Sequence, residues 1–98
     1  MNSNELDELR EKIDSIDTRI AGLFEQRMSA VRLIGEYKLA HGLPTEDAAR
    51  EAEHINKTGE LLSDKDLIPY WEKFLEGLFR ISKEYQWTLK DGCPSRKK

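Results

Sequence analysis

The sequence predicts an all-α fold of three helices, long, short and long, which associates with a second copy of the chain as an intertwined helical homodimer. Apolar residues recur at steps of three and four over most of the chain, as they do along amphipathic helices. No segment shows the alternation of apolar and polar residues that is typical of a strand. The first helical pattern is also longer than a single domain of 98 residues can cover.

The first helix is predicted to begin at a cap formed by Ser3 or Asn4 and to end at Gly42, with Pro44 just beyond. At about 1.5 Å per residue, these roughly 37 residues make a rod of about 55 Å. A compact domain of this size has a radius of gyration of only about 13 Å, so we expect the rod to pack against a second copy. Its heptad-like apolar stripe is formed by Leu6, Leu9, Ile13, Ile16, Ile20, Leu23, Ala30, Ile34 and Tyr37.

The second helix is predicted to be short. Thr45 is the expected N-cap, which places Glu46 and Asp47 in the first turn, where acidic side chains complement the helix dipole. Gly59 is the expected stop.

The third helix is predicted to follow Asp66 as N-cap, because Pro69 then falls in the first turn, where its missing N–H costs nothing. It is expected to pack along most of its length. Residues 1–90 are thus predicted to form one domain, followed by a disordered tail at 91–98. The apolar positions of this helix are Leu67, Trp71, Phe74, Leu78, Ile81 and Tyr85.

Composition excludes several classes of function. A net charge of -3 provides no basic field, which argues against a nucleic-acid partner. No run approaches the roughly 18 apolar residues of a membrane span, and the first residues lack an apolar signal core, so we expect a cytoplasmic protein. The one cysteine, Cys93, allows neither a disulfide framework nor a Cys/His metal site, and we expect no metal or cofactor.

Polar side chains that interrupt the apolar stripes are the candidates for function. Arg27 occupies a core position of the first helix, and Lys38 follows 11 positions later on nearly the same face. Taken alone, each candidate has an ordinary structural explanation, such as fixing register or complementing a helix dipole. The others are two i, i+4 pairs and an arginine: Asp47 and Glu51 with Arg50, and Ser82 with Gln86.

Taken together, these residues point to a ligand. Several donors and one carboxylate acceptor suit a small dianion that carries a hydroxyl and a neutral oxygen acceptor. No Ser/His/Asp, Cys/His or metal-binding set accompanies them. A cationic pocket without a nucleophile favours a reaction driven by positioning and electrostatics.

The order and spacing of these positions resemble the all-helical class (type II) of chorismate mutases, which convert chorismate to prephenate in aromatic amino-acid biosynthesis. The resemblance runs across residues 6 to 89, although residues 52 to 66 contain no motif of the family, and Glu46 with the Ala48-Ala49 pair departs from its usual turn. The matching segments are LREKIDSIDTRI with Arg10, LFEQRMSAVRLIGEYK with Arg27 and Lys38, PTEDAARE with Asp47, Arg50 and Glu51, and FRISKEYQ with Ser82 and Gln86.

The resemblance implies a role for each residue. Arg27 would bind one substrate carboxylate, and Arg10 from the other subunit would help to bind the dianion. Lys38 would donate to the ether oxygen and a carboxylate, and Gln86 would donate a second hydrogen bond to that ether oxygen. Arg10 and Lys38 lie 28 positions apart, about 42 Å along one helix, so they can serve one small ligand only if an antiparallel second chain brings Arg10 across.

The resemblance also implies that Glu51 would accept a hydrogen bond from the ring hydroxyl, with the backbone amide of Asp47 nearby. Ser82 and Arg50 would support carboxylate binding. The implied reaction is a unimolecular Claisen rearrangement without a cofactor.

Three alternative functions remain open. An isochorismate-pyruvate lyase resembles this family in fold, although the DAARE segment and Ser82 favour the mutase. A regulatory module of a partner pathway enzyme and a helical dimerisation protein are the others.

Overall fold

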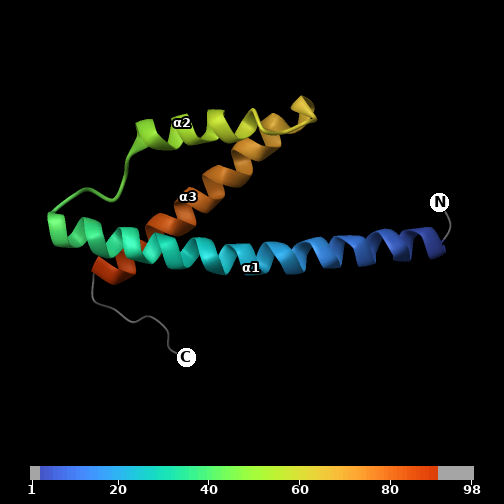
Figure 1. Ribbon diagram of the computed structural model, residues 1–98, viewed down its shortest axis with the longest axis horizontal. Helices are drawn as coiled ribbons and strands as arrows, with labels where there is room; N and C mark the ends of the chain where they lie inside the picture. The colour runs from blue at the N-terminus through green and yellow to red at the C-terminus, as the bar shows by residue number, and fades with distance from the viewer. Residues whose placement is uncertain (1–2, 91–98) are drawn as a thin grey trace. The chain divides into compact units, whose positions relative to one another are not determined.

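The computed structural model describes residues 3–90 and contains four helical elements (Figure 1). The long helix α1 spans Ser3–His41, α2 spans Ala48–Gly59, the short 3-10 helix η1 spans Lys65–Leu67, and α3 spans Ile68–Lys90. No strand occurs within these residues, so the all-α prediction of a long, a short and a long helix is confirmed. The predicted tail at 91–98, with Cys93, lies outside the described residues.

The chain divides into two units, Met1–Ala30 and Val31–Lys98, and α1 runs through both. In the first unit none of the described residues is buried. The predicted stripe on α1 is open to solvent, with Ile13 55% and Leu23 61% exposed. A continuous exposed apolar stripe is typical of a surface that binds a protein partner.

The end of α1 is formed as predicted. Gly42 adopts a left-handed conformation, with φ of 65°, which a glycine tolerates without strain. The amide of Leu43 donates to the carbonyl of Lys38 at 2.8 Å, and the amide of Gly42 donates to that of Leu39 at 3.4 Å. This pair of bonds is the Schellman arrangement that ends a helix and satisfies its last carbonyls.

The predicted cap of α2 is wrong by two residues. Asp47, not Thr45, is the N-cap, and its Oδ1 accepts from the amide of Arg50 at 3.1 Å. The carbonyl of Thr45 instead accepts a hydrogen bond from Lys38 Nζ at 2.9 Å, which holds this residue in the loop before the helix. Glu46 and Asp47 therefore precede the first turn, whereas the predicted stop at Gly59 is confirmed.

The predicted cap of α3 is also wrong. Asp64 caps η1, with its Oδ1 accepting from the amide of Asp66 at 3.0 Å, and α3 continues directly from η1. A tight 3-10 turn often precedes an α-helix, and here it takes the cap two residues upstream. Pro69 still lies in the first turn of α3, as expected.

The helices of the second unit enclose only a small core. Leu75 and Val31 are buried, with 2% and 7% exposure. The predicted packing of the third helix along most of its length is met only in part, since Phe74 and Ile81 are 48% and 40% exposed. No helix within residues 3–90 combines the length and the apolarity that crossing a membrane requires.

Part-buried hydrogen bonds connect helix α2 to α3. The indole Nε1 of Trp71 donates to Thr58 Oγ1 at 2.7 Å, and that hydroxyl donates to the carbonyl of His54 at 2.7 Å. A Cβ built on Gly59 would meet Ile68 and Trp71 at 3.9 Å, an ordinary contact distance. The end of α2 therefore lies close to the start of α3, and the bond from Trp71 to Thr58 joins the two helices.

Candidate functional site

A pocket of about 480 Å³ lies where the C-terminal part of α1 meets α3, within the second unit. Its walls are the last turns of α1, the turn that follows them, and one side chain of α3. Lys38 and Gln86, the two side chains predicted to donate to a reacting oxygen, both line it. They are far apart in sequence and come from different helices, so only the fold brings them together.

Gln86 is held firmly between the two helices. Its side chain is buried, with 8% exposure, and its Nε2 donates to the carbonyl of Val31 at 2.9 Å. An amide nitrogen carries two protons, so one remains for a ligand. Gly35 makes this position possible, because a Cβ there would lie only 2.9 Å from Gln86 Cγ.

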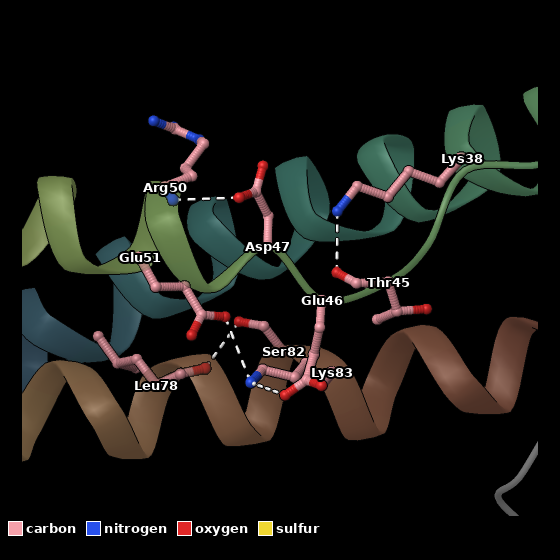
Figure 2. Close-up of polar contacts among 9 residues, drawn as sticks. All are labelled: Lys38, Thr45, Glu46, Asp47, Arg50, Glu51, Leu78, Ser82 and Lys83. Carbon is pink, nitrogen blue, oxygen red and sulfur yellow. Dashed lines mark hydrogen bonds and ion pairs between the residues drawn. The ribbon is translucent and has the colours of Figure 1, made fainter.

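Lys38 reaches across the turn to the loop that leads into α2. Its Nζ donates to the Thr45 carbonyl at 2.9 Å, as Figure 2 shows, and its side chain is half-buried. An ammonium carries three protons, so this bond fixes its direction and leaves others to point into the pocket.

The start of α2 gathers the predicted acidic residues and one arginine. Asp47 caps the helix, and the amide of Glu51 donates to the Asp47 carbonyl at 3.0 Å. Figure 2 shows the side chain of Arg50 directed away from Glu51 and from α3, and this residue is exposed. These three residues and Ser82 are not among the residues that line the pocket.

Ser82 lies on α3 and its side chain points toward the start of α2, as Figure 2 shows. Its Oγ donates to the carbonyl of Leu78 at 2.7 Å, one turn earlier on the same helix. A serine hydroxyl has one proton and two acceptor lone pairs. Donation to a substrate carboxylate would therefore require this hydroxyl to rotate away from Leu78.

Sequence reasoning missed Lys83. Its Nζ lies 2.8 Å from Glu46 Oε2 and 3.3 Å from Glu51 Oε2, and so joins α3 to the start of α2 (Figure 2). The hydrogen bond to Glu46 is the main cause that raises the pKa of Lys83, and the same bond lowers the pKa of Glu46. Lys83 directly follows Ser82, but an ion pair between separate helices has no spacing signature in the sequence.

The remaining predicted residues, Arg10 and Arg27, belong to the unit Met1–Ala30. Arg10 is exposed on α1. Arg27 is half-buried, and the partial loss of solvent lowers the pKa of its guanidinium. Within residues 3–90 no group of three or more His, Cys, Asp or Glu side chains is arranged to hold a metal ion.

Comparison with known families assigns the chain to one of them. Residues 9–87 match the family model described as chorismate mutase type II. The chain belongs to this family. The matched range contains every predicted site residue, from Arg10 to Gln86. Searches of curated proteins and of solved structures found no match.

An ammonium and a buried amide donor in one pocket can stabilise negative charge on an oxygen placed between them. The amide is fixed by Val31 and the ammonium by Thr45, so neither donor has to be ordered when that charge develops. This preorganisation suits a reaction whose transition state is more polar than its ground state.

Proposed function

We propose that this protein is a chorismate mutase, which converts chorismate to prephenate in aromatic amino-acid biosynthesis. The observation that carries the proposal is the placement of Lys38 and Gln86 in one pocket, on two different helices of a chain of this family. Both residues stand at positions where the family resemblance implies donors to the ether oxygen of the substrate. Residues 1–90 are proposed as the mutase domain of a cytoplasmic enzyme.

The reaction is unimolecular. One carbon–oxygen bond breaks as a carbon–carbon bond forms, and negative charge builds on the ether oxygen without any proton transfer. Donors aimed at such an oxygen are worth about 2.7 to 4 kcal/mol each in enzymes where one has been removed. Lys38 and Gln86 therefore account for much of the acceleration, and binding of the folded conformer supplies the rest.

Substrate binding is assigned to the remaining polar and charged residues at positions that the family resemblance implies. Arg27 binds one carboxylate, and Arg50 and Ser82 support carboxylate binding. Glu51 accepts from the ring hydroxyl with the amide of Asp47 nearby. The bidentate geometry of arginine suits carboxylates, which favours this division of roles.

The active form is proposed to be an intertwined homodimer with Arg10 contributed across subunits. The exposed stripe on α1, with Ile13 and Leu23 more than half exposed, supports this assembly. Burial of a large aliphatic side chain stabilises a protein by about 1.5 to 3 kcal/mol. A single chain leaves the stripe on α1 exposed, and a second copy would bury it. In an antiparallel pair, the Arg10 end of one α1 lies against the Lys38 end of the other.

The function is tested by following the loss of chorismate absorbance with the purified chain, with prephenate identified by acid conversion to phenylpyruvate. Isochorismate is run in parallel. Turnover of chorismate to prephenate is expected. Release of pyruvate from isochorismate without chorismate turnover would mean a lyase, and no reaction with either substrate would favour a regulatory module.

The shared site is tested by mixing two inactive variants, Arg10→Ala and Lys38→Ala. A mixed dimer of these variants has one site with both residues and one site with neither. Random exchange of subunits is therefore expected to restore about a quarter of wild-type activity. If Arg10 acts within its own chain, the mixture stays inactive.

A further inference from the structure

We propose that Lys83 is a positioning residue for the mutase reaction, which holds the Glu51 carboxylate in the orientation that accepts the ring hydroxyl of the substrate. The inference rests on the proposed function of the site. Lys83 lies outside the set of residues that the family resemblance assigns, and it is identified by its contacts alone.

The geometry connects Lys83 to Glu51 directly. Figure 2 shows the ammonium of Lys83 between two carboxylates, with 2.8 Å from Nζ to Glu46 Oε2 and 3.3 Å to Glu51 Oε2. The Lys83 and Glu51 side chains are 17% and 27% exposed, whereas that of Glu46 is 69% exposed. The Lys83–Glu51 pair is therefore partly shielded from solvent, whereas Glu46 is largely open to it.

The proposed role of Glu51 requires a neighbouring cation. Glu51 has three side-chain torsions, and an acceptor for one hydroxyl must be held in one rotamer to be useful. The proposed substrate is a dianion, so a carboxylate without a neighbouring cation would repel it. Lys83 answers both requirements, because its charge offsets that of Glu51 and its contact restricts the side chain.

The ammonium acts through Glu51 rather than on the substrate. Its Nζ is already bonded to two carboxylates that come from α2 and from the loop before it. The hydrogen bond to Glu46, followed by that to Glu51, raises the pKa of Lys83, so the cation persists through neutral pH. Lys83 thus stays charged at neutral pH, and Glu46 helps to keep it in place.

A double-mutant cycle separates positioning from a general effect on the fold. Lys83→Met is expected to raise the KM for chorismate about fivefold, the upper range for a partly exposed pair, with kcat within about twofold of wild type. In a Glu51→Gln background the same substitution is expected to leave KM unchanged, because the partner is gone. In a Glu46→Gln background the increase is expected to persist. Lys83→Arg is expected to restore KM, and Lys73→Met, at an exposed position of the same helix, is the matched control.

Two results would overturn the positioning role while chorismate turnover by wild type stands. One is a Lys83→Met variant with unchanged KM. The other is an equal KM increase in the Glu51→Gln background, which would mean that Lys83 acts on the substrate or on the fold. Circular dichroism checks the helices, and Lys83→Gln replaces Lys83→Met if that variant does not fold. A wild-type chain that does not convert chorismate would instead refute the proposed function, and this inference with it.

Discussion

Adding one methyl group at Gly35 should disturb the proposed active-site pocket without breaking a helix. A Cβ at this position would lie 2.9 Å from Gln86 Cγ and 3.3 Å from Leu89 Cδ1. Carbon atoms pack best at about 3.5 to 4.0 Å, so the Gln86 side chain, or α3 with it, must move away from α1 by roughly 0.5 to 1 Å. The 2.9 Å bond from Gln86 Nε2 to the Val31 carbonyl lengthens as this happens.

The expected loss of activity follows from that displacement. A misplacement of about 1 Å can cost about 100-fold in rate, and complete loss of an oxyanion donor costs about 100- to 1,000-fold. Gly35→Ala only displaces Gln86, so we expect kcat to fall about 10- to 100-fold. Replacing a helical glycine by alanine favours the helix by about 1 kcal/mol, so the helical content should survive.

The assay compares kcat for chorismate in wild type, Gly35→Ala and Gly77→Ala, with circular dichroism on each. Gly77 is the matched control because it lies in α3 and a Cβ there meets nothing within 4 Å. The control is expected to keep its rate. If Gly35→Ala retains kcat within about twofold of wild type, the reasoning that a close helix approach positions Gln86 is refuted.

Three further predictions concern pH and assembly. Gln86→Glu is expected to confine activity to acid, because a carboxyl group donates a hydrogen bond only when protonated; a flat pH profile of kcat would contradict this role. Since hydrogen bonding lowers the pKa of Glu46 from 4.5 and raises that of Lys83 from 10.5, the stability removed by Lys83→Met is present between those values. This stability is lost as the pH falls through the lowered pKa of Glu46 or rises through the raised pKa of Lys83. The melting temperatures of wild type and Lys83→Met should therefore converge in acid. An equal difference between the two melting temperatures in acid and at neutral pH would contradict the ion pair. Ile13→Glu, on the exposed stripe of α1, is expected to shift the mass in sedimentation from dimer to monomer, and an unchanged dimer would exclude that stripe from the interface.

The sequence was most informative where local chemistry decides the structure. Gly42 and Pro44 end α1 because one tolerates the left-handed conformation and the other cannot continue a helix, and both effects act within a few residues. The start of α2 was harder to predict. Thr45 and Asp47 are both good caps, and the choice between them involves a tertiary bond, in which Lys38 Nζ takes the Thr45 carbonyl.

The candidate site likewise contains residues that the sequence pattern predicts and residues that only the tertiary contacts reveal. Lys38 and Gln86 could be singled out because polar side chains on apolar faces are visible in the periodicity, and they do share a pocket. Lys83 could not, since its bond to Glu46 joins residues 37 positions apart and leaves no pattern. Gly35 carried a usable signal, because a glycine inside a helix costs about 1 kcal/mol and often marks a close approach.

The rate of chorismate conversion by Lys38→Ala, measured beside wild type, tests the proposed mechanism most directly. Removing an ammonium aimed at the ether oxygen is expected to lower kcat about 100-fold or more, with the helical circular dichroism unchanged. A Lys38→Ala variant with near-normal kcat would contradict the assignment, because the pocket between α1 and α3 would then not be where the rearrangement is catalysed.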